Sequence, residues 1–469
     1  MDFSLIDDDA GAVPILALPK ADPAAWGERT AVRERHWAAA TGFAADAGKL
    51  VLIPDEEGGL GRVLVGLGDG PGAAGGLWAL AGLSETLPAG RYRLEALPAG
   101  GDPTRLALGW ALGTYAFTRY REKTGGGAAL VWPRGADRAL VERLAEAVFL
   151  ARDLVNTPAS DMGPAELAAE AARVAEAQGA RYREIVGDRL VAENYPTIHA
   201  VGRASVREPR LVDILWGEEN APKVTLVDKG VCFDSGGLDL KTASGMRMMK
   251  KDMAGAAIVL GLGQAIMAAR LPVRLRLLLP IVENAVSGNA MRPLDIVRTR
   301  KGLTVEIGNT DAEGRLILCD ALAEASRDQP ALLVDIATLT GAARVALGPE
   351  LPGLFANDDE LAAALAAAAT AEDDPLWRLP LWRPYRQMID SKVADLNNVS
   401  ESPHAGAITA ALYLAEFVDP GIPWAHLDVM AWNPRARPGR PEGAEAQTLR
   451  ALYAAIAGRF GIASGRDSA

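Results

Sequence analysis

Short apolar runs of strand length alternate with segments of helical periodicity along almost the whole of this 469-residue chain. The strand-like runs lie at residues 13–18, 62–68, 92–97, 128–132, 211–215, 224–227, 274–282 and 331–336. Such alternation is typical of α/β folds, and the length exceeds that of one ordinary domain. We therefore predict two α/β domains. A smaller one at residues 1–150 ends in a linker helix, and a larger one at residues 151–469 has a mixed central sheet.

Two regions of the second domain hold most of the candidate chemistry. Residues 224–253 and 305–321 each contain a strand-like run and lead into a helix-like segment, with glycines that let backbone pass close to a ligand. In open α/β sheets the ligand crevice lies beyond the carboxyl ends of the strands, where both regions fall. Their candidate functional residues are Lys229, Asp234, Lys241, Asp252, Asp311, Glu313 and Arg315.

If the two regions meet, four carboxylates share one site. So many like charges do not stay ionised in a buried place without cations, and a pair of divalent metals is the simplest explanation. The two cysteines and four scattered histidines form no recognisable zinc motif, so the metal site must depend mainly on carboxylates. Taken singly, each acid is also explained as a helix cap, a turn residue or a surface ion pair.

Charge and hydropathy exclude several other classes. The net charge of −11 and the pI near 5.1 argue against a general binder of nucleic acid or of anionic membranes. The acidic start of the chain lacks the pattern of a signal peptide, and no apolar run reaches the roughly 20 residues that span a bilayer. We expect a cytoplasmic protein with no membrane or nucleic-acid partner.

Two long runs of the second domain resemble the leucyl (cytosol) aminopeptidase family. The first is KGVCFDSGG at residues 229–237, continuing through Lys241 to Asp252, and the second is NTDAEGR at residues 309–315. Segments at 338–342, 394–396 and 405–411 extend the likeness over most of residues 150–432. Residues 442–447 depart from the family's usual turn, which leaves the shape of one wall of the substrate pocket open.

The resemblance implies a two-metal aminopeptidase that hydrolyses the N-terminal residue of peptides through a metal-bridging hydroxide. Asp234 and Glu313 would bridge the ions, Asp311 would complete one metal site, and Lys229 and Asp252 would complete the other. The cofactors would be two divalent ions per subunit. Zinc and manganese are expected first, but carboxylate-rich sites also accept cobalt or magnesium.

The resemblance further implies that Lys241 polarises the scissile carbonyl and that Arg315 binds a bicarbonate ion acting as general base. Met249, Thr338 and Gly341 would line the side-chain pocket and favour an apolar residue such as leucine or methionine. Ordinary core packing explains these three residues almost as well. The family likeness also implies a homohexamer.

Other interpretations stay open at this stage. The segment 233–237 superficially resembles the nucleophile loop of a serine hydrolase, although that group is all-β and needs a paired histidine. A non-enzymatic binding protein on a peptidase scaffold is a second alternative. The glycines at 70–75 have the formal spacing of a dinucleotide loop, but Pro71 removes a backbone donor there, so a plain turn is preferred.

Overall fold

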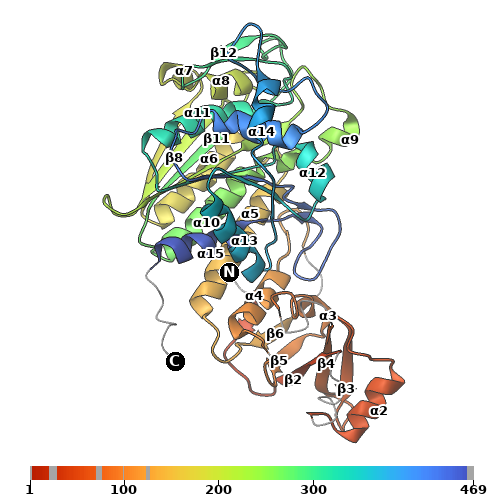
Figure 1. Ribbon diagram of the computed structural model, residues 1–469. Helices are drawn as coiled ribbons and strands as arrows, with labels where there is room; N and C mark the ends of the chain where they lie inside the picture. The colour runs from red at the N-terminus through yellow and green to blue at the C-terminus, as the bar shows by residue number, and fades with distance from the viewer. Residues whose placement is uncertain (1–2, 21–28, 70–75, 99, 123–126, 462–469) are drawn as a thin grey trace. The chain divides into compact units, whose positions relative to one another are not determined.

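The computed structural model describes residues 3–20, 29–69, 76–98, 100–122 and 127–461, and its chain divides into two compact units (Figure 1). The first consists of Met1–Phe149 together with Pro434–Glu442, and the second of Leu150–Asn433 together with Gly443–Ala469. Two α/β domains are therefore confirmed. The two predicted ranges were continuous and did not include the return of 434–442 to the first unit. The glycine-rich run 70–75 lies outside the described residues.

The first unit is built on a six-stranded sheet with the order β1-β6-β5-β2-β4-β3. Only the β3–β4 pair is antiparallel among these neighbours. The expected strand at 92–97 ends at Leu94, and β3 was not predicted. The elements are β1 (Leu5–Ile6), β2 (Val13–Pro19), α2 (Val32–Ala40), β3 (Leu50–Pro54), β4 (Leu60–Gly68), α3 (Leu83–Thr86), β5 (Gly90–Leu94), α4 (Pro103–Gly113) and β6 (Ala128–Val131).

The second unit has a nine-stranded mixed sheet. The order is β16-β15-β18-β14-β9-β11-β8-β7, and β10 pairs with the far end of β11. The pairs β7–β8, β8–β11 and β15–β18 are antiparallel, and the other pairs are parallel. The strands are β7 (Arg181–Val186), β8 (Arg210–Trp216), β9 (Lys223–Asp228), β10 (Gly230–Asp234), β11 (Arg274–Asn284), β14 (Leu332–Ala337), β15 (Gly353–Ala356), β16 (Trp377–Arg378) and β18 (Trp424–Asp428).

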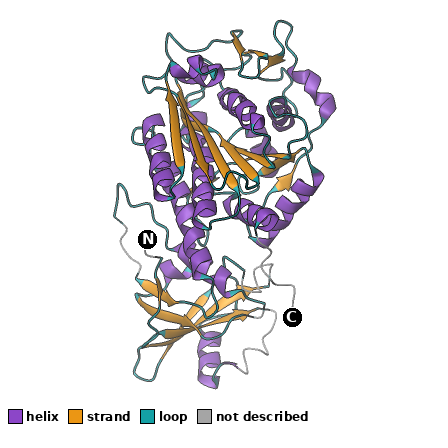
Figure 2. Cartoon of the chain, turned by 90° about the vertical axis from the view of Figure 1, so that its left-hand side faces the viewer, coloured by secondary structure: helices purple, strands orange, loops and turns teal. Residues whose placement is uncertain are grey.

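Helices cover both faces of this larger sheet (Figure 2). α11 packs on one face beside α8 and α14, whereas α10 packs on the other beside α6 and α15. α5 (Arg138–Asn156) contains the chain boundary between the two units, which follows Phe149. The remaining helices are α6 (Pro164–Ala177), α7 (Arg189–Ala192), α8 (Pro196–Gly202), α9 (Ala243–Met246), α10 (Ala254–Ala268), α11 (Glu313–Arg327), α12 (Gly341–Leu347), α13 (Asp359–Ala371), α14 (Gly406–Ala415) and α15 (Leu449–Phe460), with 3₁₀ helices η1 (Met249–Met253) and η2 (Arg383–Ile389).

α10 is apolar on nearly all sides, as expected of a helix buried in a large core. Its two glycines allow it to lie close to the sheet. A Cβ atom on Gly255 would come 2.2 Å from the carbonyl oxygen of Ile336, and one on Gly263 would come 2.5 Å from Leu277 Cδ1. This contact fixes the start of α10, and therefore the η1 turn before it, against the ends of the central strands.

Two small sheets lie outside the large one. β12 (Ile296–Arg298), β13 (Thr304–Glu306) and β17 (Leu396–Asn397) form the first, and β19 (Trp432–Asn433) and β20 (Gly443–Ala444) form the second. Among the described residues no helix is long and apolar enough to cross a membrane.

Candidate metal centre and active site

A change of strand pairing places Lys229 at the carboxyl end of the sheet. β9 pairs with the first half of β11 and β10 pairs with its second half, and Lys229 lies between β9 and β10. Its backbone N–H donates to the carbonyl of Ile336 on β14. β10 then ends at Asp234, which lies opposite Asn284. Two predicted site residues and one unpredicted one therefore lie at the ends of adjacent strands.

The two regions singled out in the sequence do meet. Lys229 Nζ lies 2.7 Å from Asp252 Oδ2 and 2.8 Å from Glu313 Oε1, and all three side chains are buried. Asp234, Asp252 and Glu313 each offer a carboxylate oxygen, and these oxygens lie within 4.8 Å of one another. Asp252 comes from η1 and Glu313 from the first turn of α11.

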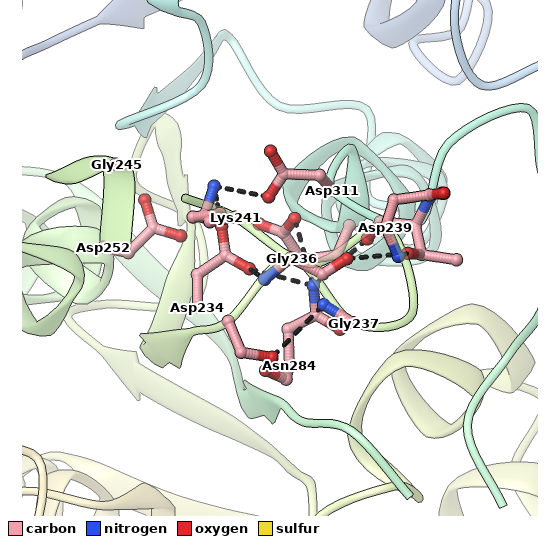
Figure 3. Close-up of polar contacts among 12 residues, drawn as sticks. Asp234, Gly236, Gly237, Asp239, Lys241, Gly245, Asp252, Asn284 and Asp311 are labelled. Atoms are coloured by element: carbon pink, nitrogen blue, oxygen red, sulfur yellow. Dashed lines mark hydrogen bonds and ion pairs between the residues drawn. The ribbon is translucent and has the colours of Figure 1, made fainter. Parts of the chain in front are cut away.

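A second lysine joins the cluster from the loop after β10 (Figure 3). Lys241 Nζ lies 2.8 Å from Asp234 Oδ2 and forms an ion pair with Asp311. The other oxygen of Asp234 accepts hydrogen bonds from the backbone of Gly236 and from Asn284 Nδ2, both at 2.9 Å. Asp311 is the least buried of the four acids, with a side chain 31% exposed.

Burial and charge together shape the protonation of this cluster. Burial raises the pKa of Glu313 to about 7 and that of Asp234 to about 6, and it also raises the pKa of Asp311. Burial alone would lower the pKa of Lys229, but the charges of Asp252 and Glu313 hold it above its ordinary value. The ammonium groups of Lys229 and Lys241 thus lie beside the carboxylates and compensate part of their negative charge. A dication in the same place would favour the neutral amine of Lys229.

The donor set fits divalent metals. Asp252 Oδ2, Asp311 Oδ1 and Glu313 Oε1 are buried oxygens without a hydrogen-bond partner among the described residues. Each forms an ion pair with a lysine ammonium. Converging carboxylate oxygens are the ligands that divalent cations such as magnesium and manganese take, and zinc also accepts carboxylate and nitrogen ligands.

Glycine makes this convergence possible at one close contact. A Cβ atom on Gly314 would lie 2.6 Å from both Cδ and Cε of Lys229. Because Lys229 is held by Asp252 and Glu313, its side chain has little room to move away. The residue after Glu313 must therefore be very small for α11 to begin beside the cluster.

The cluster opens into a pocket of about 590 Å³. Of the residues proposed from the sequence, all except the buried Glu313 and Arg315 line it. Met249, Thr338 and Gly341 are in its wall. Thr338 has a further contact that was not expected, because its hydroxyl donates to Asp252 Oδ1 at 2.7 Å and so orients that carboxylate.

Arg315 is buried and does not line this pocket. Its Nη1 donates to the carbonyl of Asn398 at 2.5 Å, its Nε has no hydrogen-bond partner among the described residues, and burial lowers its pKa. Ser235, the candidate nucleophile of the alternative interpretation, donates its hydroxyl to the Asn284 carbonyl and accepts from Gly237 N–H. Neither of these hydroxyl contacts involves a histidine, so the serine-hydrolase alternative has no support here.

Sequence reasoning missed Asn284 and Lys251. Asn284 binds Asp234 and could have been found, because it is a polar residue that closely follows the apolar run at 277–282. Lys251 lines the pocket and is buried, and burial lowers its pKa to about 8. The neighbouring Lys250 has the same side chain but instead donates to the Asn156 carbonyl.

The atypical segment 442–447 has a structural role away from the pocket. Glu445 forms a buried ion pair with Arg152 at 3.1 Å, and Gln447 accepts a hydrogen bond from the backbone of Ala431 and donates one to the Pro349 carbonyl. No residue of this segment lines the described pocket. Its departure from the family pattern therefore leaves the pocket wall to other residues, among them Met430.

Comparisons with known proteins agree with this site. The profile described as "Cytosol aminopeptidase family, catalytic domain" matches residues 149–453, and the profile "M17 aminopeptidase, N-terminal domain" matches residues 13–133. The "Probable cytosol aminopeptidase" of Leifsonia xyli subsp. xyli is 41% identical over 442 residues, which cover 88% of each chain.

Solved structures of similar proteins extend the match to three dimensions. The crystal structure of the cytosol aminopeptidase from Coxiella burnetii has a TM-score of 0.93 and 48% identity, covering 97% of this chain and 99% of the other. The bottromycin maturation enzyme BotP, solved in complex with Mn, has a TM-score of 0.87 and 36% identity, covering 95% of this chain and 99% of the other. The chain therefore belongs to the cytosol aminopeptidase family and is a metalloaminopeptidase, a hydrolase of peptides.

Proposed function

We propose that this enzyme uses two divalent metals to remove apolar residues, such as leucine or methionine, from the N-termini of peptides. One observation carries the proposal: Asp234, Asp252 and Glu313 are buried around Lys229 with their oxygens converging. A cluster of that kind is costly to bury unless cations compensate it. The membership of the family supports the same reading.

Lys229, Asp234, Asp252, Asp311 and Glu313 are the residues that we propose as metal ligands. Two ions bound there would supply an activated water at neutral pH and stabilise developing negative charge. Zinc and manganese are the proposed metals, and the Mn complex of BotP supports the second. Asn284, Gly236 and Thr338 would keep the carboxylates of Asp234 and Asp252 oriented.

Lys241 is the proposed electrophile. Its side chain reaches the pocket next to Asp234 and Asp311 and is only 15% exposed. An ammonium in such a place can donate to the scissile carbonyl and stabilise the oxyanion that forms from it. Arg315, the last residue of the family run at 309–315, is the proposed holder of bicarbonate as general base.

The pocket wall supports the proposed apolar preference. Met249, Leu351, Val429 and Met430 present aliphatic or thioether groups beside the metal cluster. Thioethers adapt to substrate side chains of different shape. The pocket volume of about 590 Å³ lies within the range of about 300 to 1,000 Å³ that is usual for small-ligand sites.

Substitution of Glu313 tests the metal role. In Glu313→Gln we expect kcat/KM for leucyl-p-nitroanilide to fall at least about 100-fold, because a ligand is lost while the volume stays the same. Metal analysis should show fewer than two ions per chain, with an unchanged circular-dichroism spectrum. Glu360→Gln, at an exposed position of α13, is the matched control and should stay within about twofold of the wild type. Full activity of Glu313→Gln with two bound ions would contradict the proposal.

A further inference from the structure

Lys251 is a buried cation in the pocket that the proposed mechanism does not use. Its side chain is 5% exposed and lines the pocket. Within the described residues its ammonium has no hydrogen-bond or ion-pair partner. An ammonium that lines a pocket without a protein partner can donate to a ligand, so a group that supplies an acceptor gains from binding there.

Within the described residues no acid forms an ion pair with Lys251. Asp428 lines the same pocket, but it already accepts hydrogen bonds from Leu339 N–H, from Thr340 N–H and from the Thr340 hydroxyl. Arg344 adds a second cation from the exposed side of the pocket, and its Nη1 has only the Met430 sulfur, at 3.9 Å. Away from the metal cluster, the pocket therefore carries an excess of positive charge.

Part of the wall of this pocket is apolar. Met249 and Met430 lie among the lining residues together with Leu351 and Val429. A ligand that satisfies both features has an aliphatic stem and an anionic end. Such a carboxylate belongs more readily to the side chain of the N-terminal residue than to the C-terminus of the peptide. The C-terminus of a longer peptide would lie outside the pocket, because its chain must extend out of it.

We propose that Lys251 is a specificity-determining residue that binds the side-chain carboxylate of an N-terminal glutamate or aspartate, with Arg344 assisting at the exposed side. The enzyme thereby accepts acidic N-terminal residues in addition to apolar ones. A leucine side chain is shorter than that of glutamate and leaves the ammonium to water. This inference rests on the proposed aminopeptidase function and adds a substrate class to it.

The test compares substrates that lack a C-terminal carboxylate. The metal-loaded wild type is expected to cleave both α-glutamyl- and leucyl-p-nitroanilide. Lys251→Met should lower kcat/KM for the glutamyl substrate by about 10- to 100-fold, the range of one lost charged hydrogen bond, and change the leucyl value less than about threefold. Arg344→Met should lower the glutamyl value less. Arg247→Met removes an exposed cation outside the pocket and should change neither.

Several outcomes would overturn the inference. One is a wild type that cleaves the leucyl but not the glutamyl substrate, and another is an equal loss of both in Lys251→Met. A loss confined to leucyl dipeptides with a free carboxylate, and absent with their amides, would assign Lys251 to the peptide C-terminus instead. If Lys251→Met does not fold, Lys251→Arg must keep the glutamyl-to-leucyl ratio within about threefold and Arg344→Met must lower it. No turnover of either substrate by the metal-loaded wild type would contradict the proposed function itself.

Discussion

Gly314 sets how closely α11 approaches Lys229. The residue lies directly after Glu313, and a side chain there would overlap the aliphatic stem of the lysine. The steric limit acts on the same lysine that two carboxylates hold by charge. The ion pairs of Lys229 therefore depend on the close packing of α11 against its side chain. A single methyl group at residue 314 is enough to move the lysine away from its two carboxylates.

Gly314→Ala tests this dependence. We expect the metal affinity to fall at least about tenfold, because the new Cβ displaces Lys229 from Asp252 and Glu313. Isothermal titration with Mn²⁺ measures the change. Gly458→Ala in α15 is the matched control, since a Cβ there meets nothing within 4 Å. Equal affinities for all three proteins would show that Lys229 has more freedom than the structure suggests.

The two adjacent lysines show where sequence reasoning stops at this scale. Lys250 turns toward the Asn156 carbonyl and the ring of Trp432, whereas Lys251 turns into the pocket. The difference arises because both lie in η1, a tight 3₁₀ turn, and not in a regular α-helix. The acids Asp234, Asp252, Asp311 and Glu313 could be grouped in advance because the motif repeats a known pattern. No feature of the sequence indicated that the side chain of Lys251 lines the pocket.

At the scale of elements, the parallel register of β14 and β18 buries a polar cluster in the sheet. Asp335 lies opposite His426, and its carboxylate lies 2.6 Å from His426 Nδ1 and accepts from Trp424 Nε1 at 2.7 Å. All three side chains are fully buried. Burial alone would lower the pKa of His426, but the charge of Asp335 holds it above the ordinary value.

His426→Gln should therefore destabilise the protein in a pH-dependent way. A histidine whose pKa is raised by folding contributes most below its unfolded pKa, about 6.5, and the contribution is lost as pH rises through the folded pKa. We expect a loss of about 3 to 5 kcal/mol near pH 6, measured by urea unfolding, and a smaller loss at pH 9. His36→Gln, exposed on α2, should change the free energy of unfolding by less than about 0.5 kcal/mol. A loss independent of pH would mean that His426 is neutral throughout.

The elements were predicted best where a run is long and strongly patterned. α10 and β11 match their expected positions within two residues, because one is apolar on nearly all sides and the other contains the long apolar run at 277–282. β3 and β10 were missed, since each has only five residues and depends on a partner strand to form. Asp234 is positioned by the end of β10, which the sequence did not predict. From the sequence, the regions 224–253 and 305–321 could therefore be brought together only through the family pattern.

At the scale of the whole molecule, every residue proposed for catalysis lies in the second unit. This unit also exposes large apolar side chains beside a second pocket of about 480 Å³, which Phe233, Leu240, Met246 and Val286 help to line. Leu240 is 61% exposed and Val286 is 55% exposed. Exposed apolar groups of this kind often mark association surfaces.

We expect the homohexamer that the family resemblance implies, with a mass in solution about six times 49.3 kDa. Light scattering after size exclusion measures it. Val286→Glu should shift the protein toward smaller species, because a charge is costly to bury at an apolar contact. Val206→Glu, at an exposed position outside this pocket, should not. A wild-type mass of one chain at micromolar concentration would contradict the expectation.

The return of residues 434–442 to the first unit has a practical consequence for dissecting the protein. Arg440 stacks on Trp78 at 4.2 Å, so a fragment that stops at residue 149 would lack a piece of its own packing. A single proteolytic cut between residues 149 and 150 would also fail to release the whole first unit, because residues 434–442 of that unit remain covalently joined to the second unit on both sides. Any attempt to graft or swap this half between relatives has to carry both pieces.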